Sequence, residues 1–283
     1  MRIVFTVAAL ASILCVLLIC LFLLVRGVPT IGVIGPLKFL TGTVWKPGSD
    51  IYGVAPMIIG SIYVTAGAVV TGVPIGLLTA VFMAKFCPQG LHRLFSPAVA
   101  LLAGIPSVVY GFFGLVVLVP AIRDFMRHVG IDGSGKSVVT ASLLLGMMIL
   151  PTIISVSEAA IRAVPDSYYE GALALGATHE RAVFFAVLPA AKSGILAAVI
   201  LGVGRSIGET MAVIMVAGNQ ALIPEGLKGL FKGVRTLTAN IVLEMGYSAD
   251  MHRKALIATA VVLFVFILII NLLFSAMKSR QPV

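Results

Sequence analysis

The sequence predicts an all-α membrane protein with six transmembrane helices. Of its 283 residues, 60% are hydrophobic and only 11% are charged, and the mean hydropathy is +1.13. An ordinary soluble domain is about half apolar and a quarter charged, so a soluble core could not bury this much apolar surface. The apolar residues also gather in six long stretches, each long enough to cross a hydrocarbon layer of about 30 Å as a helix.

The first stretch, Ile3–Val25, follows Met1 and Arg2 and could be taken for a secretory signal peptide. It is longer than the apolar core of a typical signal peptide, and Arg26 stands where a small-residue cleavage site would be expected. At about 1.5 Å per helical residue, its length matches the thickness of the hydrocarbon layer. We therefore expect an uncleaved first transmembrane helix.

Five further stretches are each expected to form one transmembrane helix: Met57–Ala84, Pro97–Pro120, Val138–Val156, Ile195–Ala217 and Ala255–Met277. Six crossings place both ends of the chain on one side. Nothing suggests a separate soluble domain, so residues 1–283 are expected to form one membrane domain. Cytoplasmic loops are usually richer in Lys and Arg, but one side carries eight of these residues and the other eleven, so charge does not decide the orientation.

The formal net charge of +9 does not indicate nucleic-acid binding, because the 20 Lys and Arg residues are scattered along the chain. The three cysteines imply no disulfide framework. The four histidines lie far apart without the spacing of a zinc site, so no metal or cofactor is expected. The spans contain no Ser/His pair or paired aspartates, so the chain is not expected to be an enzyme.

Residues 130–137, GIDGSGKS, match the phosphate-loop pattern GxxxxGK[ST] of nucleotide-binding proteins. In those proteins the loop follows a buried strand in a soluble α/β sheet, and an acidic residue on another strand holds magnesium. Here the segment joins two membrane spans, and too little chain surrounds it for a nucleotide-binding fold. We therefore expect an ordinary loop that binds no ATP, and expect Lys136→Ala to leave the activity of the protein intact.

The segment between the fourth and fifth stretches is the most structured of the polar regions. Ser167 and the glutamate three residues later have the spacing of a capping box, in which a helix begins at the serine. Gly176 can end that helix in the left-handed conformation, and Thr178 can begin a second helix. Pro189 suits the first turn of the span that follows. Residues 166–189, the elbow, are thus expected to form two short helices that dock against another protein.

Two charged residues, Arg205 and Glu209, lie within the fifth stretch. Burying either charge in hydrocarbon is costly, and such residues usually line a polar route through the membrane. Four residues apart, they are expected to share one face of a continuous helix, and the alternative to a pathway role is a structural ion pair. The arginine fork suits an oxyanion, because it offers bidentate hydrogen bonds and stays charged when dehydrated. Ser206 and Thr210 would add hydroxyls to the same region.

Ser107 and Tyr110, in the third stretch, are further candidates for lining the pathway. Their stretch, like the second and fourth, contains glycine and proline. The alternative interpretation is bundle packing, in which small residues let helices approach and prolines kink them.

The elbow resembles the EAA loop of permease subunits in ABC importers. It contains Glu170-Gly171-Ala172, then Gly176, then Val187-Leu188-Pro189, and departs from the pattern only in having Gly171 for the first alanine. The resemblance implies that the elbow is cytoplasmic and docks on an ATP-hydrolysing subunit, so that both termini are cytoplasmic. The residues expected at that contact are Ser167, Glu170, Gly171, Ala172 and Gly176.

Three longer segments resemble the phosphate-specific (Pst) permeases: residues 102–111, 148–153 and 204–213. The short segments 217–219 and 243–247 are more similar to the PstC-type subunit than to its PstA-type partner. The resemblance implies a type I (MetI-like) importer permease that carries inorganic phosphate across the bacterial cytoplasmic membrane. In that family the arginine and glutamate of the fifth span are associated with phosphate passage, which corresponds here to Arg205 and Glu209.

The same resemblance implies a set of partners. These are a PstA-type permease in a heterodimer, two PstB-type ATPase subunits and an extracytoplasmic phosphate-binding protein, all arranged around the lipid bilayer. The alternatives are a PstA-type subunit or a permease for another oxyanion. From another class, a stand-alone secondary transporter or channel would be expected to show internal repeats and unwound half-helices, and the sequence shows no repeat. A signalling role, with a PhoU-type partner that responds to phosphate supply, can coexist with transport.

Overall fold

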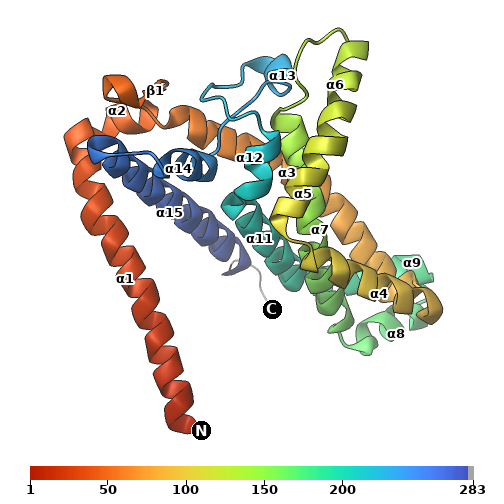
Figure 1. Cartoon of the computed structure of the whole chain (residues 1–283). Helices are drawn as coiled ribbons and strands as arrows, with labels where there is room; N and C mark the ends of the chain where they lie inside the picture. The colour runs from red at the N-terminus through yellow and green to blue at the C-terminus, as the bar shows by residue number, and fades with distance from the viewer. Residues whose placement is uncertain (280–283) are drawn as a thin grey trace.

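The computed structural model describes residues 1–279, with side chains up to residue 273, and residues 280–283, which include Arg280 and the predicted cytoplasmic C-terminus, lie outside the described part. The regular secondary structure of the described chain is helical apart from one short hairpin (Figure 1). Five helical runs are long and apolar enough to cross a membrane, and a bent pair gives a sixth. This agrees with the all-α membrane fold predicted from the sequence. The five are α1 (Arg2–Ile34), α3 (Ala55–Val81) with the π-helical turn Phe82–Phe86, the run from α5 (Ser107–Phe113) through Gly114–Leu118 to α6 (Val119–His128), α7 (Val138–Arg162) and α15 (Asp250–Ser279).

The bent pair joins the elbow to the fifth span. The helical run α9 (His179–Ala182), Val183–Val187 and α10 (Leu188–Ala190) meets α11 (Lys192–Gly208) at an angle of 69°. α12 (Met211–Val216) follows after a short break. The fifth stretch, expected to be one helix over Ile195–Ala217, is therefore divided into α11 and α12.

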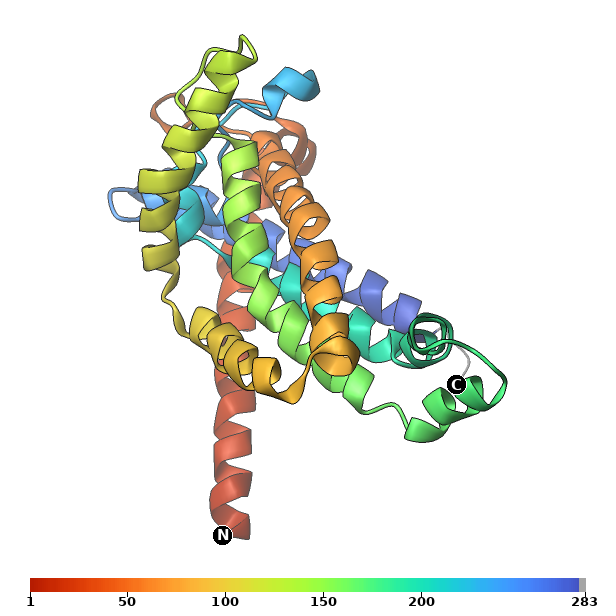
Figure 2. The same ribbon diagram turned by 90° about the vertical axis from the view of Figure 1, so that its right-hand side faces the viewer.

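The centre of the bundle is the contact between α3 and α7, which lie side by side in both views, with α11 packed on α7 (Figures 1 and 2). A methyl group at Gly72 of α3 would lie 2.8 Å from the Gly146 carbonyl oxygen of α7. Glycine is required at Gly72 because the two backbones approach closely, which confirms helix packing as its role. The core there is completed by α5 and α12 and includes Val64, Ala68, Leu144, Leu145, Met148, Ala212, Val213 and Val216.

α1 extends away from the bundle, and its apolar side chains are exposed along most of its length (Figure 1). It meets α15 near Gly27, where a side chain would collide with Val261. After α1 come α2 (Pro36–Thr41), the strands β1 (Trp45–Lys46) and β2 (Ile51–Tyr52), and the 3-10 turn Pro47–Ser49 between them. An exposed helix that is apolar on every side suits contact with lipid, as expected for the first span.

The third span begins later than predicted. The stretch Pro97–Pro120 was expected to cross as one helix, but α4 (Gln89–Gly104) is a separate helix, and the membrane-length run is Ser107–His128. Ile105 is extended (φ −68°, ψ 125°), because the following Pro106 disfavours a helical conformation in the residue before it.

The molecule has two distinct ends (Figures 1 and 2). α8 (Asp166–Ala174), α9, the start of α4 and the N-terminus of α1 lie toward one end, here called the elbow end. The hairpin, α13 (Gly226–Gly229) and α14 (Leu237–Met245) lie toward the other, the hairpin end.

Candidate functional site

The candidate pathway residues surround the break in the fifth span. α11 ends just before Glu209, whose backbone is extended (φ −71°, ψ 130°). The prediction that Arg205 and Glu209 share one face of a continuous helix is therefore wrong. The Glu209 carboxylate accepts hydrogen bonds from the backbone N–H groups of Thr210 (3.2 Å) and Ala212 (3.5 Å). It thus satisfies N–H groups at the start of α12 that have no partner within that helix, which stabilises the break.

Arg205 lies on the exposed side of α11 and makes no hydrogen bond or ion pair with any residue that the structure describes. The alternative of an Arg205–Glu209 ion pair is not realised. The neighbouring Ser206 is buried, and its hydroxyl has no partner among residues 1–279. Thr210 donates its hydroxyl to the Gly208 carbonyl oxygen over 3.2 Å. The guanidinium of Arg205 therefore keeps its donors free for a ligand.

α5 carries the other two pathway candidates. Tyr110 is buried and donates its hydroxyl to the Leu102 carbonyl oxygen over 2.9 Å, across the break between α4 and α5. Ser107, half-buried, is the first residue of α5. α5 packs on α12, since a methyl group at Gly111 would lie 3.0 Å from the α-carbon of Ala212. The hydroxyl of Tyr110 is thus already used in a structural hydrogen bond, and α5 is held beside α12, the helix that follows the break.

The first elbow helix begins differently from the prediction. α8 starts at Asp166 with Pro165 as its N-cap, and no side chain caps it, so the capping box of Ser167 and Glu170 is wrong. Proline at a helix start and a negative charge in the first turn already suit the helix end, and Asp166 provides that charge. Ser167 is therefore inside the helix.

The rest of the elbow largely follows the sequence. Gly176 is left-handed (φ 85°), and its N–H donates to the Leu173 carbonyl oxygen over 2.8 Å. Ala177 donates to the Ala172 carbonyl oxygen over 3.1 Å, and this pair of bonds is the Schellman pattern, which confirms the predicted end of the helix. Thr178 caps α9, also as predicted. Pro189, however, lies in α10, before the 69° bend, and not in the first turn of α11.

The inner face of the elbow is fixed to the bundle. Val183 and Val187 are buried against Ala80 of α3 and Ile161 of α7. The Tyr169 hydroxyl and Nδ1 of His179 form a hydrogen bond of 2.7 Å, and the His179 ring packs edge-on against Phe86 at 4.8 Å. A movement of the elbow must therefore be transmitted to α3 and α7.

The outer face of the elbow is open. Ser167, Glu170 and Gly171 are exposed, Ala172 is half-buried, and Leu175 is 91% exposed. A methyl group at Gly171 would meet nothing within 4 Å, so the departure from alanine leaves free space on this face. An exposed leucine and exposed polar groups beside it are features of a protein-binding surface.

The phosphate-loop match lies in a connection between α6 and α7, as predicted. Gly130 and Gly135 have positive φ (72° and 81°), and Ser137 is the buried N-cap of α7, accepting a hydrogen bond from the Thr140 N–H. The strands of the described chain lie within residues 45–52, so none precedes this loop. The absence of ATP binding stays a prediction.

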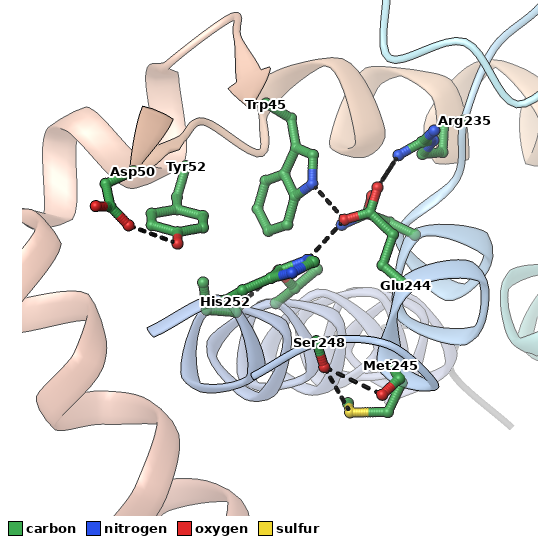
Figure 3. Close-up of polar contacts among 11 residues, drawn as sticks. Trp45, Asp50, Tyr52, Arg235, Glu244, Met245, Ser248 and His252 are labelled. Atoms are coloured by element: carbon green, nitrogen blue, oxygen red, sulfur yellow. Dashed lines mark hydrogen bonds and ion pairs between the residues drawn. The ribbon is translucent and has the colours of Figure 1, made fainter. Parts of the chain in front are cut away.

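A polar cluster at the hairpin end was not predicted from the sequence (Figure 3). Glu244 of α14 is 6% exposed, and its Oε1 lies 2.6 Å from Nη1 of Arg235. Its Oε2 accepts the indole N–H of Trp45 and contacts Nε2 of His252, both at 2.8 Å. The hairpin, the segment before α14 and the start of α15 therefore meet at one carboxylate. The sequence signal was a glutamate in an apolar helix, but its partners lie up to 199 residues away.

Tyr52 lies beside this cluster and donates its hydroxyl to Asp50 over 3.0 Å. Burial, with the Asp50 hydrogen bond and charge, raises the pKa of Tyr52 to about 12. Among the described residues, no group of three or more His, Cys, Asp and Glu side chains could hold a metal ion.

Comparison with known sequences places the chain among transport proteins. Residues 72–281 match the family described as binding-protein-dependent transport system inner membrane component. The probable ABC transporter permease protein YqgH of Bacillus subtilis is 38% identical over 100% of this chain and 91% of its own. The phosphate transport system permease protein PstC of Mesorhizobium japonicum is 33% identical over 82% of this chain and 75% of its own. PstC 2 of Mycobacterium tuberculosis is 34% identical, over 90% and 84%.

Solved structures share the fold. A chain of the MetNI methionine ABC transporter in inward-facing conformations matches with a TM-score of 0.63 and 20% identity, covering 83% of this chain and 98% of that one. A chain of a bacterial ABC transporter for the import of alginate matches with a TM-score of 0.62 and 16% identity, covering 98% and 96%. At these identities the similarity concerns the fold alone.

Proposed function

Because this chain belongs to the family of binding-protein-dependent transport system inner membrane components, we propose that it is the PstC-type permease subunit of a bacterial ABC importer for inorganic phosphate. It is a multi-pass inner-membrane protein. In this proposal residues 1–283 form a single permease domain, and residues 166–189 form its cytoplasmic coupling loop. The chain contributes half of the translocation pathway and cleaves no bond itself.

The observation that carries the proposal is Arg205, a cation on the exposed face of a membrane helix with no partner among the described residues. A guanidinium facing lipid would cost several kcal/mol, so another subunit or a water-filled route must cover it. The adjacent exposed Leu201, one helical turn away, supports contact with another apolar subunit. We infer that Arg205 lies in a cavity between this permease and its partner, where it binds the phosphate oxyanion bidentately.

The remaining pathway residues have supporting roles in this proposal. Glu209 stabilises the break that ends α11 beside Arg205, and its carboxylate is occupied by the N–H groups of α12. The anion at Arg205 therefore does not need to displace it. Ser206, Thr210, Ser107 and Tyr110 add hydroxyls around the same point.

Permeases of this kind work with a second permease and ATPase subunits. We assign a PstA-type partner, two PstB-type ATPases and an extracytoplasmic phosphate-binding protein. The ATPase contact is the outer face of the elbow, formed by Ser167, Glu170, Gly171, Ala172 and Gly176. The N-terminus lies at the elbow end (Figures 1 and 2), which supports a cytoplasmic N-terminus.

The test is phosphate uptake by the reconstituted complex carrying Arg205→Gln. A charge-assisted hydrogen bond contributes about 1.5–3 kcal/mol, so loss of a bidentate pair predicts at least about a hundredfold loss of uptake. Subunit assembly should be unchanged, because Arg205 has no partner in the described chain. Arg127→Gln is the matched control, since that side chain is 67% exposed and pairs with Asp124 at the surface of α6. Wild-type uptake by the Arg205→Gln complex would show the assignment to be wrong.

Two variations of the assay separate the alternatives. Competition by arsenate and sulfate shows whether another oxyanion is the better substrate. The break between α11 and α12 is also a feature of secondary transporters, which need no ATPase. Uptake that persists without ATP would favour that class, whereas uptake that stops supports the importer. Measuring the phosphate response of cells separately from uptake tests the signalling role and its PhoU-type partner.

A further inference from the structure

A basic cavity opens at the elbow end, away from Arg205. It has a volume of about 420 Å³ and lies where the end of α3, the start of α4 and the end of α7 meet. Its lining includes the cationic side chains of Lys85, Arg93 and Arg162, together with His92. The pathway proposed above uses none of these residues.

The positive charge of this cavity is not balanced by the described chain. Glu158 is the acidic partner there, and it contacts Nε2 of His92 at 2.7 Å and Nε of Arg162 at 2.8 Å. Arg93 is exposed and forms no ion pair with residues 1–279, and Lys85 lies over the Tyr169 ring at 5.7 Å from its centroid. One carboxylate thus faces three permanent cations, which leaves an excess of two positive charges before His92 is counted.

The orientation of Arg162 is fixed, which suits it to a ligand. Its Nε donates to Glu158, and its Nη2 donates to the Met83 carbonyl oxygen over 2.9 Å. The guanidinium is therefore held in one position, and its Nη1 has no partner within the described residues. A fixed guanidinium recognises phosphate oxygens with less loss of conformational freedom than a mobile one.

The start of α4 adds to the positive potential. This helix of 16 residues has no side-chain cap and no acidic residue in its first turn, and its Gln89 lines the cavity. The N-terminal end of a helix carries partial positive charge, so the cation of Arg93 beside it is unfavourable unless an anion binds there. A side chain at Gly90 would meet nothing within 4 Å, so a ligand can approach these N–H groups.

We propose that this cavity binds a phosphate group, supplied either by the headgroup of an anionic lipid or by free inorganic phosphate. Basic pockets between membrane helices on the cytoplasmic side bind phosphate-bearing lipid headgroups in this way. The cytoplasmic location rests on the proposed function, whereas the anion site rests on the cavity itself. Lys85 links the cavity to the elbow, because it lies over the ring of Tyr169, which also forms a hydrogen bond with His179. An anion bound in the cavity therefore acts on these elbow residues.

The experiment measures the melting temperature of the detergent-solubilised complex carrying Arg205→Gln, so that the proposed pathway site does not contribute. Inorganic phosphate and short-chain phosphatidylglycerol are titrated separately, with phosphatidylcholine as the uncharged lipid control. A ligand that binds the folded state raises its stability in proportion to ligand concentration over Kd. We expect phosphate or phosphatidylglycerol to raise the melting temperature, and Arg93→Gln or Lys85→Gln to weaken that binding about tenfold or more.

The outcomes are distinct. A response to phosphatidylglycerol alone assigns the site to lipid, and a response to phosphate assigns it to the free anion. Arg127→Gln, an exposed arginine at the far end of the molecule, should leave either response unchanged. The proposal is overturned if neither ligand stabilises the complex. It is also overturned if Arg93→Gln and Lys85→Gln respond to the ligand as strongly as the complex that carries Arg205→Gln alone. Both variants should fold, because neither side chain has an ion-pair partner in the described chain. Loss of uptake in Arg205→Gln is a separate result and does not affect this one.

Discussion

Replacement of Glu244 by glutamine should destabilise the protein without changing the shape of the side chain. The carboxylate is 8% exposed and balances Arg235, whose own side chain is 19% exposed. Removing one partner of a buried ion pair costs about 3–5 kcal/mol, because the other charge is left unpaired. Arg235 keeps hydrogen bonds to the Asn219 carbonyl oxygen and to Oδ1 of Asn240, so we expect the lower end, about 3 kcal/mol.

The assay uses the only tryptophan of the chain, which lies in the cluster itself. Trp45 donates its indole N–H to Glu244, so its fluorescence reports on this carboxylate and on local unfolding. For a chain of about this size, 1 kcal/mol shifts the melting temperature by about 2–4 °C, so Glu244→Gln predicts a loss of about 6–12 °C. The emission should also change, because the indole loses a charged acceptor.

Glu225→Gln is the matched control, since that glutamate is exposed and its side chain makes no hydrogen bond with described residues. It should change stability by less than about 0.5 kcal/mol. Combining Glu244→Gln with Arg235→Gln should recover part of the loss, because the unpaired charge is then absent. If Glu244→Gln melts like Glu225→Gln with unchanged Trp45 emission, the cluster does not join the hairpin to α14 and α15 as argued.

Gly72→Ala should destabilise the bundle by about 1–3 kcal/mol, because its methyl group would lie 2.8 Å from a carbonyl oxygen of α7. Gly48→Ala is the control, since its methyl group would meet nothing within 4 Å. Equal melting temperatures for the two variants would contradict the close packing of α3 on α7. Lys136→Ala should leave ATP-driven uptake unchanged, and a loss of ATP turnover would show that its loop does bind nucleotide. Gly171→Ala should preserve ATPase docking, measured as co-purification, and failure to assemble would show that the contact needs the free space at that position. The Tyr52 pKa of about 12 lies above the value of about 10 for an unfolded chain, so its contribution to stability is complete below pH about 10 and is lost as the pH rises toward 12. Melting curves at rising pH should show this loss in the wild type and not in Tyr52→Phe, and parallel curves would contradict it.

Apolar length alone was enough to predict the spans. The boundaries depended on finer features, and the third span shows why. Hydropathy is continuous from Pro97 to Pro120, yet Pro106 forces Ile105 out of the helix and divides the stretch in two. The proline was visible in the sequence. What the sequence did not show is that the chain turns away at that point, since many membrane helices pass through a proline with only a kink.

The prediction for the candidate site was wrong at Glu209 for a similar reason, because it assumed a continuous helix. The spacing of Arg205 and Glu209 places them on one face only if the helix is continuous, and their ion pair would have satisfied both charges. In the structure the carboxylate instead accepts backbone N–H groups, and α12 begins there. Glycine before the glutamate and threonine after it are residues that favour helix ends. Gly208 and Thr210 could therefore have indicated the break from the sequence. The Glu244 cluster had only a weak signal, a glutamate in an apolar helix, because one of its partners, Trp45, lies 199 residues away.

The break at Glu209 changes how a movement of the elbow can reach Arg205. α11 begins directly after the elbow, beyond the 69° bend, and ends beside Arg205. Its 17 residues span about 25 Å at 1.5 Å per residue, which is most of the hydrocarbon thickness. A continuous fifth helix would have carried the movement of the elbow past Arg205 to the far side of the membrane. Since α11 stops there, we infer that a movement at the elbow shifts Arg205 together with α7, while α12 stays packed on α5. Under the proposed function, Arg205 then moves relative to the hydroxyls of α5, and this change of geometry would release a bound phosphate.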